Sequence, residues 1–367
     1  MKKIIFTVII FLINYIPVYC QLSNSEEKKL DSLMENAKIP GASLSIIKNS
    51  KIVYNKGFGI RSESNKVNEN TIFQAASLSK FPTALLFLIN SQNQIFDLDN
   101  EANVYLKTNK LEGFKSEPNT IPTISQLLRH TGGINIHGFL GYKPNRKIIP
   151  NIENVIEGKH TFLWEPEIKI KTKVNSELKY SGGGYCYLQK IIKDTKGKLF
   201  RTVIQEELLQ PLNMKNSFFG LTPEGVSDVA YGYKNGKPIK LGYRVYPQEA
   251  AAALWTNSFD YSQFLLEVLA GLNDDKASIL TKESITLLTT PTEISNGKKI
   301  RYGLGVGLEL DENKKVKGIT HDGRNIGYSS FFYLNIVDGS GFVLLTNANN
   351  VDLKEINELI KQNIAEN

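Results

Sequence analysis

The chain has 367 residues, of which 41% are hydrophobic, and a formal net charge of +7. This length suits one enzyme-sized unit, and the composition excludes an intrinsically disordered chain. The basic excess is mild, and no basic run with interleaved aromatic residues points to nucleic acid as a partner. We interpret the charge as a lysine-rich surface.

The first twenty residues have the pattern of a secretory signal peptide. Lys2 and Lys3 precede an apolar run over residues 4–13, which is shorter than the roughly 20 residues of a membrane-spanning helix, so we expect no stable membrane span. We expect cleavage after Cys20 and export to the periplasm or the medium. A lipid anchor on Cys20 is the alternative, and the preceding Tyr19 disfavours it.

Cysteine and histidine usage gives no sign of a metal or a disulfide. The mature chain keeps one cysteine, Cys186, and therefore has no internal disulfide. The four histidines are scattered, and His130 and His137 have no acidic partner at ligand spacing. We therefore expect no metal site. The sequence does not assign an oligomeric state.

Strand patterns lie at both ends of the mature chain, and helix patterns lie between them. In chain order we expect a helix at 26–37, strands at 42–47 and 52–60, a helix from about Ser77, helices at 125–130, 188–193, 199–209, 261–269 and 282–288, strands at 302–310, 317–321, 329–336 and 341–346, and a helix at 353–364. The long polar segment 138–173 is more extensive than most loops, which favours function or mobility there.

This order predicts an α+β fold in which an antiparallel sheet is built from both termini, with flanking helices and an inserted, mostly helical subdomain. We expect residues 1–20 to be removed and 21–367 to form a single domain. Its α/β part comprises 21–95 and 300–367, and its helical subdomain comprises 96–299. The functional site is expected in the cleft between the two parts.

One serine–lysine pair lies in an apolar setting. Five serines are followed three residues later by lysine, and of these Ser77 with Lys80 is flanked by apolar residues on both sides. Burial would lower the pKa of Lys80 and let it act as a base toward Ser77. The local sequence leaves open whether Ser77 is only a helix cap.

Two further motifs follow along the chain. Tyr180 precedes glycines 182–184 ahead of an expected helix, where the backbone can approach closely and a phenol can relay protons. The other motif, at the end of an expected strand where a backbone N–H can face an oxyanion, comprises His321, Asp322, Gly323 and Arg324. Taken singly, each also fits an ordinary turn.

The order of the three motifs resembles the penicillin-recognising serine hydrolases. More specifically, the chain resembles the class C β-lactamase-related family, which also holds esterases and D-amino-acid peptidases. Residues 39–48, 124–133, 210–214 and 302–305 resemble further segments of that family. The resemblance covers most of residues 38–348.

The resemblance implies an exported serine hydrolase that cleaves an ester or amide of a small molecule or peptide through an acyl-enzyme on Ser77. Lys80 and Tyr180 would share the role of general base. The backbone N–H groups of Ser77 and Arg324 would form the oxyanion hole. The residues that would contact the substrate are His321, Asp322, Gly323 and Gly182. No metal or cofactor is implied.

Two departures from the family pattern bear on the substrate. Gly182 stands where the family has asparagine and lacks a side-chain amide, and His321 replaces a lysine and is less reliably cationic. Asp322 adds a negative charge beside it. These changes argue against an efficient β-lactamase but not against hydrolysis. A D-alanyl carboxypeptidase or β-lactamase-type hydrolase, and a catalytically silent sensor or binding protein of the same fold, remain alternatives.

Overall fold

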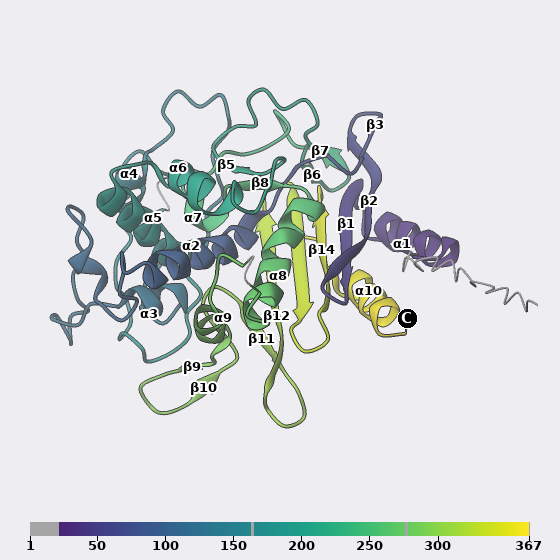
Figure 1. The fold of residues 1–367 in the computed structure, drawn as a ribbon. Coiled ribbons are helices and arrows are strands. Elements are labelled where there is room, and N and C mark those ends of the chain that lie inside the picture. Colours follow the sequence, from purple (N-terminus) through teal and green to yellow (C-terminus); the bar gives the residue numbers. More distant parts are fainter. Residues whose placement is uncertain (1–21, 163–164, 276–277, 367) are drawn as a thin grey trace, which may run out of the picture.

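The computed structural model describes residues 22–162, 165–275 and 278–366 (Figure 1). The expected signal peptide, including Cys20, lies outside the described residues. Where the expected elements differ from the observed ones, the differences fall mainly at their ends and around the three motifs.

A seven-stranded antiparallel sheet organises the fold, in the order β11-β12-β13-β14-β1-β2-β3. Its strands are β1 (Gly41–Lys48), β2 (Lys51–Ser62), β3 (Asn65–Lys66), β11 (Gly307–Leu310), β12 (Val316–Asn325), β13 (Tyr328–Asn335) and β14 (Ser340–Thr346). Strand β1 pairs with β14, with Leu44 opposite Leu344, so the two ends of the chain meet inside the sheet. The expected sheet built from both termini is confirmed.

Helices cover both faces of this sheet (Figure 1). Helices α1 (Asn24–Asn36) and α10 (Lys354–Glu366) pack on one face, where Ala42, Leu44 and Ile46 of β1 belong to their apolar cluster. Helix α8 (Ser258–Leu272) contacts β1 and β14 on the other face. Every residue of β1 is therefore buried, and the serines that alternate with these apolar residues, Ser43 and Ser45, hydrogen-bond the Ser258 hydroxyl of α8.

The Ser77 segment begins differently from the expectation. A 3₁₀ turn, η1 (Ala76–Ser79), carries Ser77, and the α-helix α2 (Lys80–Gln92) begins three residues later than expected. Lys80 through Asn90 are all buried, so α2 runs through the interior between the sheet and the helical region. Ser77 is not the cap of this helix: the cap position belongs to Ser79, which makes no side-chain cap hydrogen bond.

The helical region is assembled from short elements. They are β4 (Phe73–Gln74), η2 (Ala102–Val104), α3 (Ile124–Leu128), α4 (Ile152–Ile156), α5 (Gly182–Lys196), α6 (Phe200–Ile204), the π-helix η3 (Gln205–Leu209), β5 (Phe218–Phe219), β6 (Tyr233–Lys234), β7 (Lys237–Pro238), α7 (Glu249–Ala252), β8 (Leu254–Thr256), α9 (Lys282–Thr289), β9 (Thr292–Glu293) and β10 (Lys299–Ile300). The division of the chain at residues 95 and 300 stays a prediction.

Three expected elements differ from the observed ones. The three glycines do not precede a helix but form the first turn of α5, which Ser181 caps by accepting a hydrogen bond from the N–H of Gly184 at 3.1 Å. The strand expected to end at residue 321 continues to Asn325 as β12, so the third motif lies inside a strand and not at its end. The strand expected at 302–310 shortens to β11.

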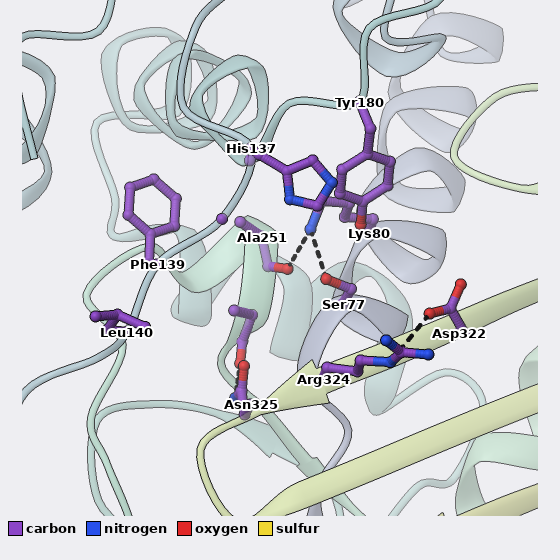
Figure 2. A pocket seen from close by; sticks show the side chains of 13 residues that line it. Ser77, Lys80, His137, Phe139, Leu140, Tyr180, Ala251, Asp322, Arg324 and Asn325 are labelled. Carbon is purple, nitrogen blue, oxygen red and sulfur yellow. Dashed lines mark hydrogen bonds and ion pairs between the residues drawn. The ribbon is translucent and has the colours of Figure 1, made fainter. Parts of the chain in front are cut away.

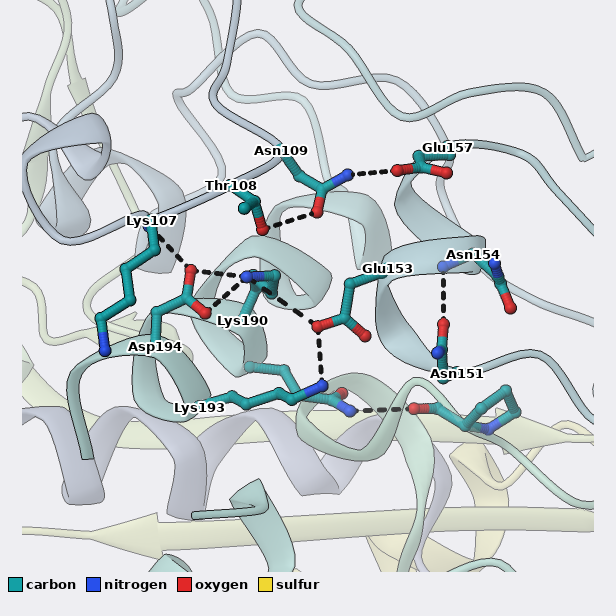
Figure 3. Close-up of polar contacts among 12 residues, drawn as sticks. Lys107, Thr108, Asn109, Asn151, Glu153, Asn154, Glu157, Lys190, Lys193 and Asp194 are labelled. Carbon is teal, nitrogen blue, oxygen red and sulfur yellow. Dashed lines mark hydrogen bonds and ion pairs between the residues drawn. The ribbon is translucent and has the colours of Figure 1, made fainter. Parts of the chain in front are cut away.

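Helix α5 contains a buried ion pair, and polar contacts around it join α5 to neighbouring segments (Figure 3). The ammonium of Lys190 lies 2.5 Å from the Asp194 carboxylate, and both side chains are almost fully buried. Asp194 also accepts the backbone N–H of Lys107 at 2.9 Å, while Glu153 of α4 accepts from Lys193 at 2.7 Å. These contacts hold the loop before residue 110 and α4 against the helix that begins beside Tyr180.

Candidate active site

Ser77 lies in a cleft of about 750 Å³ between the sheet and the helical region (Figure 2). The cleft is lined by Ser77, Lys80, His137, Gly138, Phe139, Leu140, Tyr180, Gly182, Ala251, Ala252, Asp322, Arg324 and Asn325. All three sequence motifs thus contribute to one cavity. In Figure 2, Phe139 and Leu140 lie on one side of Ser77, and Asp322 with Arg324 on the other.

Lys80 is a buried amine beside the serine hydroxyl. Its Nζ lies 3.1 Å from the Ser77 Oγ and donates to the Ala251 carbonyl at 2.7 Å, as the dashed lines in Figure 2 show. It has no carboxylate partner within 4 Å among the described residues. Burial lowers the pKa of Lys80 to about 7. The amine is therefore available in its neutral, proton-accepting form near neutral pH.

Tyr180 lies near the same hydroxyl and beside Lys80 (Figure 2). The Lys80 Nζ lies 5.1 Å from the centre of the Tyr180 ring. Burial raises the pKa of the Tyr180 phenol above its usual value, and the nearby Ser77 hydroxyl opposes this shift. Its hydroxyl is buried and has no hydrogen bond of good geometry in the described structure. A protonated phenol with an open hydrogen-bonding position is suited to relay a proton.

His130 packs against the ring of Tyr180. The two ring centres are 4.2 Å apart, and His130 Nδ1 accepts the backbone N–H of Ser181 at 3.1 Å. Burial is the main cause that lowers the pKa of His130, so the imidazole is neutral. The sequence placed this histidine in a turn that resembles the family, but gave no reason to put it next to Tyr180.

The strand of the third motif approaches η1 very closely. A Cβ added to Gly323 would lie 2.6 Å from the Ala75 carbonyl oxygen and 2.3 Å from the Ser330 Oγ, so a side chain at this position would push β12 away from η1. This approach brings Arg324 and Ser77 to the same cleft. The two residues expected to supply the oxyanion-hole N–H groups therefore come from adjoining elements.

The comparisons with known proteins agree with this arrangement. The model of the Beta-lactamase family matches residues 27–363. The chain belongs to this family. Its members share a mixed α/β fold with a large antiparallel sheet, and penicillin-binding proteins, esterases and class C β-lactamases are among its structural neighbours.

Individual relatives of this β-lactamase family member are distant. Protein flp of Staphylococcus aureus (strain MW2) is 26% identical over 343 residues, which cover 90% of this chain and 64% of that protein. The chain thus spans somewhat less than two thirds of that relative. The octameric penicillin-binding protein homologue from Pyrococcus abyssi superposes with a TM-score of 0.72 and 24% identity, covering 93% of this chain and 76% of that one.

EstCE1, described as a hydrolase with promiscuous acyltransferase activity, superposes on this chain equally well. Its TM-score is 0.72 at 17% identity, and the match covers 93% of this chain and 98% of that one. At such low identity the likeness concerns the fold alone.

Of the four expected substrate contacts, two line the cleft and two do not. Asp322 and Gly182 line it, whereas His321 and Gly323 are buried with their strand against η1. The Nδ1 of His321 lies 2.6 Å from the Asp322 carbonyl, and burial together with the charge of Lys80 lowers the histidine's pKa. His321 is therefore neutral and does not reproduce a cationic lysine. In addition to Lys80, the cationic residue that lines the cleft is Arg324.

The loop after α3 supplies a wall that the sequence did not identify residue by residue. His137, Phe139 and Leu140 line the cleft, and the long segment 138–173 had been marked as a place for function only in general terms. A Cβ on Gly182 would come within 3.0 Å of the Phe139 ring and 3.2 Å of the His137 carbonyl. The absence of a side chain at Gly182 therefore leaves room for Phe139 and His137 in this wall of the cleft.

Within the described ranges, no three or more His, Cys, Asp or Glu side chains are grouped so that they would hold a metal ion. The helices of the described residues include none long and apolar enough to cross a bilayer.

Proposed function

We propose that this protein is an exported serine hydrolase that cleaves an ester or amide through an acyl-enzyme on Ser77. The observation that carries the proposal is the Lys80 amine, which is buried without a counter-ion 3.1 Å from the Ser77 hydroxyl. A buried lysine with a pKa of about 7 is unfavourable for stability and is typical of a catalytic base.

The reaction follows from the positions of these groups. Neutral Lys80 accepts the Ser77 proton as the hydroxyl oxygen attacks the substrate carbonyl carbon. The negative charge that develops on the carbonyl oxygen is stabilised by the backbone N–H groups of Ser77 and Arg324, a contribution of about 3 kcal/mol for each donor. Lys80 and Tyr180 return the proton to the leaving group. A water molecule, deprotonated by the same pair, then releases the acid and restores Ser77.

The cleft favours an ester over a β-lactam. Neutral His321 and the bare Gly182 remove two contacts that the family pattern provides to penicillin-like substrates. Phe139 and Leu140 make one wall apolar, which suits an acyl or alkyl group. A D-alanyl carboxypeptidase or β-lactamase-type hydrolase is the second candidate because Arg324, exposed in the cleft, offers a cation to a substrate carboxylate. A catalytically silent sensor or binding protein is the third candidate.

Active-site labelling separates these candidates. We expect a fluorophosphonate probe to label the purified mature protein and to fail on Ser77→Ala. The matched control is Ser295→Ala, an exposed serine that also precedes a lysine by three residues, and it should label normally. Equal labelling of Ser77→Ala, or no labelling of the unmodified protein, would refute the hydrolase and leave the silent sensor.

Substrate assays then distinguish the two hydrolases. Turnover of p-nitrophenyl butyrate without covalent capture of a fluorescent penicillin identifies an esterase. Penicillin capture at Ser77 identifies the penicillin-recognising branch.

A further inference from the structure

A second hollow of about 420 Å³ continues from the cleft. Leu140 lines both cavities, and the neighbours Asn325 and Ile326 line the cleft and the hollow respectively. The Tyr246 hydroxyl joins the two walls, since it accepts the backbone N–H of Ile326 at 3.1 Å and lies 3.5 Å from the Leu140 carbonyl. A substrate group that passes Leu140 therefore enters this hollow.

Three cations and no acidic side chain line the hollow among the residues that the structure describes. They are Lys143, Arg146 and Arg244. Among the described residues, none of the three forms an ion pair within 4 Å. The Arg146 Nη1 and Arg244 Nε atoms are buried and have no hydrogen-bond partner in this part of the structure. Both arginines line the hollow without a carboxylate partner among the described residues, and guanidinium groups of this kind are suited to bind an anion.

The arginines are held in place before any ligand arrives. Arg146 packs over the Tyr142 ring at 4.5 Å and donates through Nη2 to the His160 carbonyl at 2.8 Å. Tyr142 and Val245 exchange backbone hydrogen bonds of 2.8 Å, which fixes the segment of Arg146 beside that of Arg244. Glu165 is the carboxylate packed against Tyr142, and it accepts the Tyr142 hydroxyl at 2.8 Å without pairing with either arginine.

We propose that this hollow binds an anionic group of the substrate, a carboxylate or a phosphate, while the scissile bond lies at Ser77. This inference rests on the proposed hydrolase function and adds the substrate class to it. The guanidinium groups suit the planar or tetrahedral oxygens of such an anion. The hollow is also lined by the apolar residues Leu140, Phe162 and Ile326, which suit a short hydrocarbon linker between the anion and the scissile bond.

Matched esters test the charge preference. One series carries an ω-carboxylate, an ω-phosphonate or a neutral ω-methyl ester on the acyl part of a p-nitrophenyl ester, with linkers of increasing length. A second series places the same groups on the alcohol part of an acetate ester. We expect kcat/KM for an anionic member of one series to exceed that of its neutral counterpart by about tenfold or more, because hydrogen bonds to charged groups are strong.

The double variant Arg146→Gln/Arg244→Gln should reduce this anionic-to-neutral ratio to about one. Lys147→Gln removes an exposed charge that does not line the hollow, and it should keep the ratio of the unmodified protein. Preference for the carboxylate or for the phosphonate identifies which anion is bound. Equal rates on anionic and neutral esters in both series, or a ratio that the double variant leaves unchanged, would overturn the inference while the hydrolase stands.

A binding measurement tests the anion site independently of the proposed hydrolase activity. If no ester is hydrolysed and no probe labels Ser77, the hydrolase proposal fails, and calorimetric titration with inorganic phosphate and with glutarate then tests the hollow alone. Binding that the double variant loses and Lys147→Gln retains supports the anion site. Absence of binding, or binding equal in all three proteins, refutes it.

Discussion

At the scale of single residues, the proposed mechanism makes the reactivity of Ser77 depend on the protonation of Lys80. The amine must be neutral to accept the serine proton, and its burial lowers the pKa to about 7. The active form therefore becomes more populated as the pH rises through 7. We expect kcat/KM for a neutral ester, or the rate of fluorophosphonate labelling, to increase tenfold per pH unit below this value and to level off above it.

Variants of Lys80 separate this effect from general titration of the protein. Lys80→Arg keeps a cation that cannot lose its proton, so the rate should fall by at least about 10³-fold at every pH. Lys298→Arg, in an exposed serine–lysine pair, should retain the profile of the unmodified protein. A rate that falls as the pH rises through 7, or a profile that persists in Lys80→Arg, would contradict the role of Lys80.

The site could be predicted from sequence only as far as order and residue type allowed. Ser77, Lys80 and Tyr180 line one cleft. Spacing and apolar surroundings alone left Ser77 and Tyr180 open to ordinary structural roles, and the order of the three motifs, which resembles a known family, selected them. The third motif predicts a substrate contact for His321, which does not line the cleft. It nevertheless shares a face of β12 with Gly323 and Asn325, and its ring centre lies 6.1 Å from that of Tyr180. The sequence could not show that burial of this face keeps the histidine neutral.

At the scale of elements, the contact between β12 and η1 positions Ser77 and Arg324, the two residues proposed to form the oxyanion hole. Gly323 allows this contact, since an added Cβ would meet the backbone oxygen of Ala75 at 2.6 Å. We expect Gly323→Ala to displace β12 from η1, to lower kcat by about 10²-fold or more, and to leave KM less affected, because donors aimed at the transition state are misplaced.

Gly307→Ala on the neighbouring strand β11 is the matched control, since its Cβ would approach only the Thr320 methyl and carbonyl, at 3.3 and 3.4 Å. We expect near-normal kcat for this variant. Unchanged kcat in Gly323→Ala, in a protein shown to be folded by its melting curve, would show that the approach of β12 to η1 does not position the donors.

Burial of the α5 ion pair makes the removal of one partner costly. Removing Asp194 leaves the Lys190 ammonium, about 2% exposed, without its closest partner. We expect Asp194→Ala to lower the free energy of unfolding by about 3–5 kcal/mol in urea denaturation. The double variant Lys190→Met/Asp194→Leu should recover most of that loss, since no uncompensated charge remains. A double variant as unstable as the single one would assign the effect to packing and to the Lys107 N–H instead.

At the scale of the whole molecule, both ends of the chain are needed to close the sheet. The strands were predictable because β1, β13 and β14 are short apolar runs bounded by turns. The wall of the cleft formed by residues 137–140 and the basic hollow beside it were not predictable. Segments 137–146 and 244–246 are brought together by the bridge between Tyr142 and Val245 and by the contact of Tyr246 with Leu140. Such non-local contacts have no signature in the local sequence.

The first described residues are packed into the fold and bear on the proposed cleavage site. Leu22 is only 4% exposed and belongs to the apolar cluster of α1, α10 and the sheet, and Ser23 caps α1 in a capping box with Glu26. Cleavage after Cys20 would retain both residues. We therefore expect the exported protein to begin at Gln21 in mass spectrometry.

A chain that begins at Glu26 loses the burial of Leu22 and the cap of Ser23. We expect its free energy of unfolding to be lower than that of the chain from Gln21 by roughly 2–4 kcal/mol, the sum of one buried leucine and one helix cap. Its active-site labelling should be retained, because α1 lies on the sheet face opposite to α8 and the cleft. Leu22→Ala in the longer chain should reproduce most of the loss. Equal stability of the two chains would show that the segment before α1 contributes nothing to the sheet face, and would remove the structural argument for cleavage before Leu22.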